Sequence, residues 1–265
     1  MEYNNKTPLR VFEAFAGYSS TSLALRRLRE NYPDFDFVRV GWAEYDPFSN
    51  LPIERQPAVV ANCHLFPEDA DKNYGDICKV PWEEVPDFDL FTYSFPCTDI
   101  SAAGKMLGLS RDSGTRSSLL WQCEKAIKIK RPRFLLMENV KQLISNRFIK
   151  DFHQWLRLIE GYGYKSFTKV LDSSKYGVPQ HRERCFCVSI LMTENNPEPK
   201  YNFPAPFKLE KCLKDVLEED VDERYFLSDD MLARFCEKSL EENTSISVDN
   251  SAIPNEDLEN WLLFS

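Results

Sequence analysis

The chain has 265 residues, of which 43% are hydrophobic and 28% charged, a composition typical of a globular protein with a substantial core. No apolar run approaches the roughly 20 residues that cross a bilayer, and the N-terminal segment lacks the apolar stretch of a signal peptide. A cytoplasmic protein is therefore expected. Eight cysteines without CxxC spacing and only three histidines argue against both a disulfide framework and a metal site.

Acidic residues are concentrated in the C-terminal part of the chain. Residues 1–190 hold 26 Lys+Arg and 24 Asp+Glu, whereas residues 191–265 hold 7 and 18. The net charge of −9 argues mildly against nucleic acid as a partner. Because the acidic residues are concentrated in the tail, the net charge does not exclude a local basic surface on the body.

Apolar runs alternate with helical patterns along the first 190 residues. In chain order, we expect a strand at 9–15, a helix at 21–30, strand 37–43, helix 52–62, strand 88–95, helix 118–129, strand 134–137, helix 148–161, strand 166–172 and a β-prone run at 185–190. This alternation predicts an α/β fold with a mostly parallel sheet and helices on both faces.

The character of the sequence changes beyond Leu191. The stretch 194-ENNPEPKYNFPAPF-207 is polar and rich in proline, which indicates a boundary. We expect a catalytic domain at 1–192 and a connecting segment at 193–220. Residues 221–265 are expected to be the acidic, partly disordered start of a truncated or separate recognition region. Short helices are expected at 209–219 and 229–240. The closing 261-WLLF-264 is apolar with no neighbouring sequence to cover it.

Four predicted strand ends carry residues suited to binding or chemistry, and ligands bind at the carboxyl ends of such strands. They are 15-FAGYSS-20, Glu44, 94-SFPC-97 and 138-ENV-140. Each alone also fits an ordinary structural role, such as a turn, a helix cap or a core thiol. Glu44 suits a pair of ribose hydroxyls, and Glu138 leaves a buried strand, where pKa shifts are common.

Taken in order, these motifs resemble the DNA cytosine-5 methyltransferases over residues 9–220. The run 11-VFEAFAGYSSTSLAL-25 is similar to the first cofactor motif of that family, although Tyr18, Ser19 and Ser20 replace its glycine-rich continuation. The Pro-Cys pair at 96–97 resembles the nucleophile motif, 138-ENV-140 the ENV motif, and 176-YGVPQHRERCF-186 the QxRxR motif. The resemblance implies a Rossmann-like S-adenosylmethionine-dependent methyltransferase fold.

The resemblance also implies a role for each matched residue. Cys97 would add to ring carbon 6 of a flipped-out cytosine, which makes carbon 5 nucleophilic toward the methyl group of S-adenosylmethionine. Glu138 would hydrogen-bond ring nitrogen 3 and the exocyclic amine. Arg182 and Arg184 would hold the carbonyl oxygen and a phosphate. The loop 98–118, with Gly104, Gly108 and Gly114, would close over the base.

Further residues follow from the same resemblance. Cofactor contacts are implied for Phe15, Ala16, Gly17, Tyr18, Glu44, Tyr45, Asp76, Ile77, Pro96 and Leu119. A supporting role is implied for Pro96, Ser101, Asn139 and Gln180. The reaction needs no metal.

The chain shows no match to the motif that supports the family's recognition domain or to its final motif. We expect double-stranded DNA as the substrate, in a restriction-modification or phage-type system, and a second polypeptide that carries the missing parts. A shortened product and a self-sufficient minimal enzyme are the alternatives. Competing functions are an RNA cytosine-5 methyltransferase and a non-catalytic cofactor-binding subunit of a split enzyme.

Overall fold

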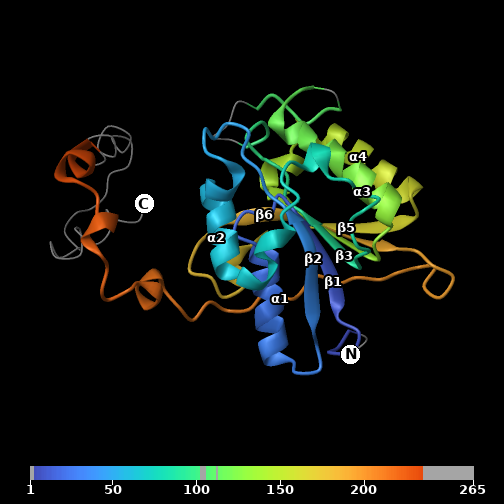
Figure 1. The fold of residues 1–265 in the computed structure, drawn as a ribbon, viewed down its shortest axis with the longest axis horizontal. Coiled ribbons are helices and arrows are strands. Elements are labelled where there is room, and N and C mark those ends of the chain that lie inside the picture. Colours follow the sequence, from blue (N-terminus) through green and yellow to red (C-terminus); the bar gives the residue numbers. More distant parts are fainter. Residues whose placement is uncertain (1–2, 102–105, 112, 235–265) are drawn as a thin grey trace. The chain divides into compact units, whose positions relative to one another are not determined.

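The computed structural model describes residues 3–101, 106–111 and 113–234, which fall into two compact units. The first unit, residues 1–212, is built on a six-stranded sheet with the strand order β2-β1-β3-β4-β6-β5 (Figure 1). In the described part of the second unit, short 3₁₀ turns form at Leu213–Val216 and Glu223–Tyr225, and residues 229–234 are helical.

The sheet is parallel except for one strand. β1 (Leu9–Ala14) lies between β2 (Phe37–Ala43) and β3 (Leu90–Tyr93), and β4 (Phe134–Val140) runs parallel to β3. β6 (Glu183–Leu191) is antiparallel to both β4 and β5 (Tyr164–Asp172). The predicted α/β fold with a mostly parallel sheet is confirmed. The reversed strand also brings the start of β6 to the edge where the parallel strands end.

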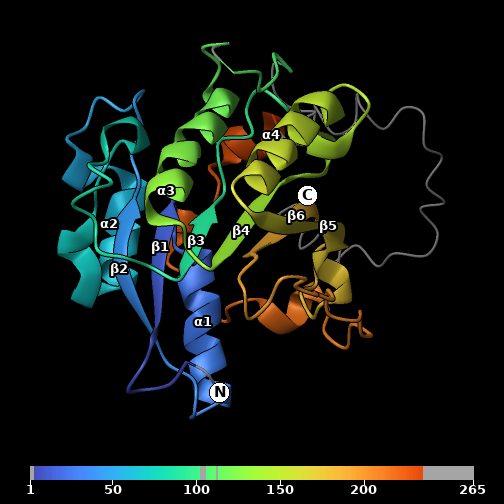
Figure 2. The ribbon, with the colours of Figure 1, turned by 90° about the vertical axis from the view of Figure 1, so that its right-hand side faces the viewer.

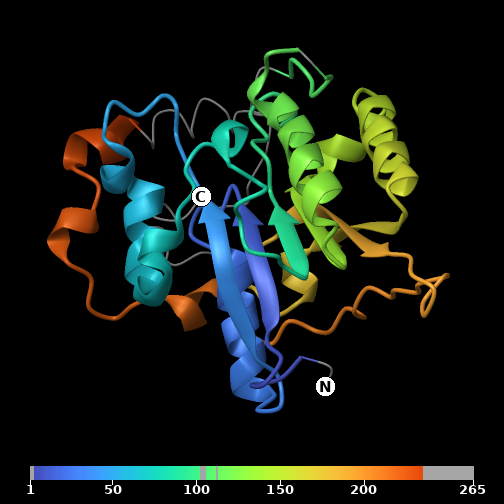
Figure 3. The same cartoon turned by 45° about the vertical axis from the view of Figure 1, so that its right-hand side comes forward.

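Helices cover the two faces of the sheet unequally. α1 (Ser20–Asn31) lies on one face, whereas α3 (Cys123–Lys130) and α4 (Ile149–Gly161) lie on the other (Figures 2 and 3). α2 (Pro57–Leu65) lies beside the β2 end of the sheet. No helix in the described part of the chain is both long and apolar enough to cross a membrane.

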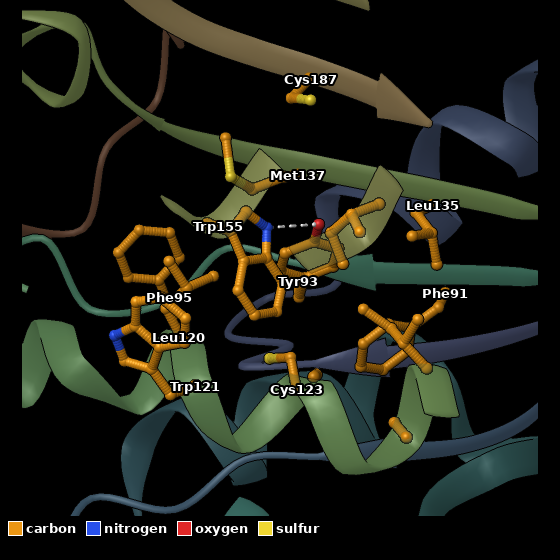
Figure 4. Close-up of a cluster of buried hydrophobic side chains, with 14 of the residues drawn as sticks. Phe91, Tyr93, Phe95, Leu120, Trp121, Cys123, Leu135, Met137, Trp155 and Cys187 are labelled. Carbon is orange, nitrogen blue, oxygen red and sulfur yellow. Dashed lines mark hydrogen bonds between the residues drawn. The ribbon is translucent and has the colours of Figure 1, made fainter. Parts of the chain in front are cut away.

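The face under α3 and α4 holds the main hydrophobic core (Figure 4). Trp155 of α4 is fully buried there and packs edge-on against the rings of Tyr93 and Trp121. Its Nε1 donates a hydrogen bond to the Tyr93 hydroxyl oxygen at 3.3 Å. Aromatic side chains from β3, α4 and the turn before α3 therefore lock these elements together.

The face under α1 carries a much smaller buried cluster, made of Leu9, Val11, Phe35 and Leu90. Further along that face, towards β5, the apolar side chains are only half-buried; they include Leu136, Phe167, Leu171, Phe186 and Val188. The sheet is thus closed on one face and partly open on the other.

Of the stretch 193–220, expected to connect two domains, residues 193–212 belong to the first compact unit. The ring of Tyr201 packs against Phe167 of β5 with centroids 6.0 Å apart. Phe207 packs against Tyr176, and its backbone N–H donates to the Lys175 carbonyl oxygen at 3.0 Å. Aromatic anchors therefore tie this proline-rich stretch to the sheet.

Several element boundaries differ from the predictions. The helix expected at 52–62 is instead a 3₁₀ turn, Ile53–Arg55, followed by α2, which begins at Pro57. The reason is that Pro57 holds Gln56 in an extended conformation. The strand expected at 88–95 spans only β3, whereas the one expected at 134–137 extends to Val140 because β6 continues to pair with it.

Two predicted helices also need correction. The helix expected at 118–129 is a 3₁₀ segment, Arg116–Gln122, that continues into α3. The prediction of a helix at 209–219 is wrong, since only the 3₁₀ turn Leu213–Val216 forms there. Of the helix expected at 229–240, residues 229–234 are helical and the rest lies outside the described residues, as does 261-WLLF-264.

Candidate active site

The predicted site residues come from elements that meet at one edge of the sheet. The loop 15–19 follows β1, Glu44 follows β2, and the segment 94–97 follows β3. Glu138 lies inside β4, opposite Phe186, and not after the strand as its sequence position predicted. Arg184 pairs with Val140 at the start of β6. The antiparallel strand therefore delivers the arginines to the edge reached by the parallel strands.

A cavity of about 610 Å³ opens at this edge. Its lining includes Phe15 and Ala16 from the loop after β1, together with Glu138, Arg182 and Arg184. The remaining wall is largely apolar and includes Leu136, Leu171, Tyr176, Val178 and Phe186. Three of the four predicted catalytic side chains thus share one cavity with the start of the predicted cofactor loop.

Glu138 and Arg184 form an ion pair within this lining. The distance from Arg184 Nε to Glu138 Oε1 is 3.1 Å, and the two side chains are 22% and 30% exposed. Partial shielding from water makes such a pair stronger than one on the open surface. The contact fixes the direction in which the Glu138 carboxylate faces the cavity.

Cys97 is half-buried and packs against the core under α3 and α4, outside the lining of the cavity. Its loop is tied down on either side of the cysteine. Asn139 Nδ2 donates to the Phe95 carbonyl oxygen at 2.8 Å. After the cysteine, the backbone N–H of Ser101 donates to the Cys97 carbonyl oxygen at 2.8 Å. The loop is therefore anchored to β4, the strand that carries Glu138.

Sequence reasoning missed two residues that shape this loop, Asp99 and Ser117. Ser117 is fully buried, and its hydroxyl donates to the Pro96 carbonyl oxygen at 2.7 Å. Its backbone N–H donates to Asp99 Oδ2 at 3.2 Å, and the Asp99 N–H donates back to Ser117 Oγ at 3.3 Å. The signal in the sequence was an acidic residue two positions after the cysteine, although its partner is 18 residues away.

The loop before the arginines depends on a further residue that sequence reasoning missed, Asp172 at the end of β5. Asp172 Oδ1 accepts a hydrogen bond from the backbone N–H of Arg182 at 3.2 Å. Its Oδ2 lies 2.8 Å from Nδ1 of His181. Gln180, predicted as a supporting residue, is exposed, and its carbonyl oxygen accepts from the Ser173 hydroxyl at 2.6 Å.

Glu44 is hydrogen-bonded to the predicted cofactor loop. The backbone N–H of Gly17 donates to Glu44 Oε2 at 2.7 Å. The Glu44 backbone is held by Asn73, whose side chain accepts from its N–H at 3.1 Å and donates to its carbonyl oxygen at 3.3 Å. Burial raises the pKa of the Glu44 carboxyl group, partly opposed by the Gly17 hydrogen bond and reinforced by the charge of Asp46.

The other predicted cofactor residues lie outside the lining of this cavity. Tyr18 and Tyr45 are 62% and 39% exposed. Asp76 accepts a hydrogen bond from the Cys78 N–H at 3.0 Å and so caps the 3₁₀ turn Ile77–Lys79. Ile77 is buried in the main core, against which Leu119 also packs; Pro96 is half-buried.

Part of the predicted closing loop 98–118 falls on residues 102–105 and 112, including Gly104, which lie outside the described residues. Within the described part of the chain, no group of three or more His, Cys, Asp and Glu side chains is arranged to hold a metal ion.

The family model described as C-5 cytosine-specific DNA methylase matches residues 9–259. The chain belongs to this family. The type II methyltransferase M2.ScrFI of Lactococcus lactis subsp. cremoris is 38% identical to it over 85% of this chain and 72% of the relative. The orphan methyltransferase M.SssI of Spiroplasma monobiae is 30% identical over 84% of this chain and 69% of the relative.

Among solved structures, the chain is similar to a mutant of DNMT2 from Spodoptera frugiperda, with a TM-score of 0.62. The identity is 20%, over 87% of this chain and 65% of the other, so this likeness supports the fold alone. The family confirms the prediction of a DNA cytosine-5 methyltransferase, with S-adenosylmethionine as the methyl donor, over the RNA and non-catalytic alternatives.

The burial of Glu44 leads to a testable dependence of stability on pH. Because its pKa is raised in the folded methylase, its contribution to stability is present at low pH and is lost as the pH rises through that raised value. Glu44→Gln removes the buried charge and keeps an acceptor for Gly17. Relative to the parent, the free energy of unfolding of Glu44→Gln should therefore increase between pH 4 and pH 8, as measured by urea denaturation.

The exposed Glu30 of α1 provides the control, because Glu30→Gln should show no such trend. A stability difference for Glu44→Gln that stays flat or decreases between pH 4 and pH 8 would contradict the assignment of a desolvated carboxylate.

Proposed function

We propose that the sheet edge described above is the active site of this cytosine methylase and that Cys97 is its covalent nucleophile. The observation that carries the proposal is the alternation of Glu138 and Asn139 on β4. Glu138 faces the cavity, whereas Asn139 holds the Phe95 carbonyl oxygen in the loop that leads to Cys97. One strand therefore sets the position of the carboxyl group and of the thiol-bearing loop together.

The proposed chemistry assigns a step to each of these groups. Sγ of Cys97 adds to ring carbon 6 of a flipped-out cytosine, and carbon 5 then takes the methyl group. S-adenosylmethionine supplies that methyl group from its sulfonium and leaves as S-adenosylhomocysteine. A base removes the proton from carbon 5, and elimination expels the Cys97 thiolate and restores the aromatic ring.

The charged lining of the cavity fits the cytosine in this scheme. The carboxyl group of Glu138 accepts a hydrogen bond from the exocyclic amine and shares a proton with ring nitrogen 3, which stabilises the charge that develops when the thiolate adds. Arg184 holds the Glu138 carboxyl group in place. Arg182, exposed beside the cavity, binds the carbonyl oxygen or a neighbouring phosphate of double-stranded DNA.

The loops after β1 and β2 fit the methyl donor. Gly17 has a φ of 53°, and a Cβ added to it would meet no atom within 4 Å, so its backbone faces open space that a ligand can occupy. The Glu44 carboxylate next to it is proposed to hold the ribose hydroxyls. Tyr18, Tyr45, Asp76 and Ile77 are proposed to line the adenine side, with Pro96 and Leu119 beyond them.

We also propose that a second polypeptide covers the open part of the α1 face and supplies the recognition domain. Half-buried apolar side chains there that lie outside the cavity lining, such as Val188, suit an amphipathic segment. The two relatives named above have further sequence, since the matched region spans 72% and 69% of them.

The complete enzyme is proposed to act in the cytoplasm, with a catalytic domain at 1–192, a connecting segment at 193–220 and an acidic recognition-side region at 221–265.

Replacing the nucleophile tests the central assignment. Cys97→Ser should lower methyl transfer to duplex DNA by at least about 1,000-fold, because a hydroxyl is a much weaker nucleophile than a thiolate. Binding of S-adenosylmethionine should stay within a few-fold. The assay measures transfer of a radiolabelled methyl group with the complementing polypeptide present, and the exposed Cys78→Ser serves as control. Transfer by Cys97→Ser at the parental rate would remove Cys97 from the mechanism.

Adding the second polypeptide tests the proposed partner. The purified chain alone should show weak or no site-specific methylation, and the product of the neighbouring gene should restore it. Val188→Glu, which places a charge on the open face outside the cavity lining, should prevent this restoration. Lys169→Glu changes an exposed residue on the same face of the sheet, in β5, and should have little effect. Robust site-specific methylation by the chain alone would rule out the requirement for a partner.

A further inference from the structure

The loop that joins β1 to α1 has an unusual backbone. Phe15, Gly17 and Ser19 have φ values of 56°, 53° and 52°, in the left-handed region. Only glycine adopts this region without a steric penalty, because Cβ of any other residue approaches its own backbone. Ser19 is also fully buried. Other contacts must therefore hold it in this conformation.

The hydroxyl group of Ser19 is bound by two side chains from outside the loop. Arg39 Nη1 of β2 and Asn62 Nδ2 of α2 each donate to Ser19 Oγ at 2.6 Å. Asn62 Nδ2 also donates to the Gly17 carbonyl oxygen at 3.2 Å. Since the Gly17 N–H donates to Glu44, Gly17 is held through both of its backbone polar groups.

Arg39 is itself fixed in the protein interior. It is 1% exposed, with Nη1 at 3.3 Å from Glu13 Oε2 and Nε at 3.4 Å from Asp69 Oδ2. Its Nη1 also donates to Asn62 Oδ1 at 2.9 Å. Replacing a buried ionic cluster of this kind by apolar residues is often neutral or stabilising, so its presence is poorly explained by stability. A role in fixing the local conformation explains it better.

We infer that Arg39 and Asn62 are positioning residues for cofactor binding. Together they hold the loop 15–19 in the left-handed conformation that turns the Gly17 N–H towards Glu44. The left-handed conformation strains Ser19, whereas a glycine at this position would not be strained. The two hydrogen bonds that the Ser19 hydroxyl accepts offset this strain. This inference rests on the proposed role of Glu44 and of residues 15–18 in binding S-adenosylmethionine.

Two serines of the same cluster make a matched pair of variants. Ser19 contacts Arg39 and Asn62 from within the loop. Ser22 lies in α1, is equally buried, and donates from its hydroxyl to Glu13 Oε2 at 2.7 Å. Ser19→Ala and Ser22→Ala each remove one buried hydroxyl from the cluster, so both should lower the melting temperature. Only Ser19→Ala frees the loop.

The affinity for S-adenosylhomocysteine, measured by calorimetry, should separate the two variants. Ser19→Ala should raise Kd about tenfold, the effect of losing a hydrogen bond to a charged group, whereas Ser22→Ala should stay within about twofold. Asn62→Asp, which keeps the acceptor for Arg39 and loses the donor to Gly17 and Ser19, should behave like Ser19→Ala. Amide hydrogen exchange of residues 15–20 should accelerate in the same two variants.

The exchange measurement needs no ligand, so it decides the positioning of the loop even if the chain alone binds too weakly for calorimetry. Equal effects of Ser19→Ala and Ser22→Ala on Kd and on exchange would overturn the inference, as would unchanged values in both Ser19→Ala and Asn62→Asp. Glu44→Ala distinguishes a failure of the proposed cofactor site from a failure of the positioning role. If Glu44→Ala binds S-adenosylhomocysteine with the parental Kd, the proposed cofactor site is wrong. If its Kd rises while the Kd values of Ser19→Ala and Asn62→Asp do not, only the positioning role fails.

Discussion

The antiparallel pairing of β6 with β4 is the constraint on which the rest of the site depends. Because β6 runs against its neighbours, its first residues lie at the edge where the parallel strands end, and Arg184 reaches Glu138. The alternation of side chains along β4 then serves two purposes. Glu138 faces the cavity, and Asn139, on the other side of the sheet, holds the loop of Cys97. A single strand pair thereby brings three distant sequence motifs together.

The two faces of the sheet differ in how they are packed and in which parts of the site they support. The face under α3 and α4 is densely packed with aromatic rings and gives the Cys97 loop a rigid base. The face under α1 is mainly polar near the site, where Arg39 and its partners hold the loop 15–19, and partly open towards β5. Rigid packing therefore lies beneath the loop of Cys97, whereas the open face leaves apolar side chains of β4, β5 and β6 only half-buried.

The sequence predicted the parallel sheet and the family correctly, because alternating apolar runs and strand-end motifs are local signals. It misjudged features that depend on distant contacts. β4 extends through Glu138 only because β6 pairs with it, and Pro57 divides a stretch that reads as one helix. Sequence reasoning missed three residues, Ser117, Asp99 and Arg39, because nothing in their local sequence indicates the hydrogen-bond partners that lie 18 or more residues away.

Covalent trapping tests the central claim most directly. A mixed-sequence duplex that contains 5-fluorocytosine cannot release the enzyme after methyl transfer, since the fluorine takes the place of the proton that must leave carbon 5. Incubation with S-adenosylmethionine and the complementing polypeptide, followed by peptide mass spectrometry, should locate the DNA adduct on Cys97. An adduct on another residue, an adduct with RNA alone, or no adduct with the complementing polypeptide present would contradict the account.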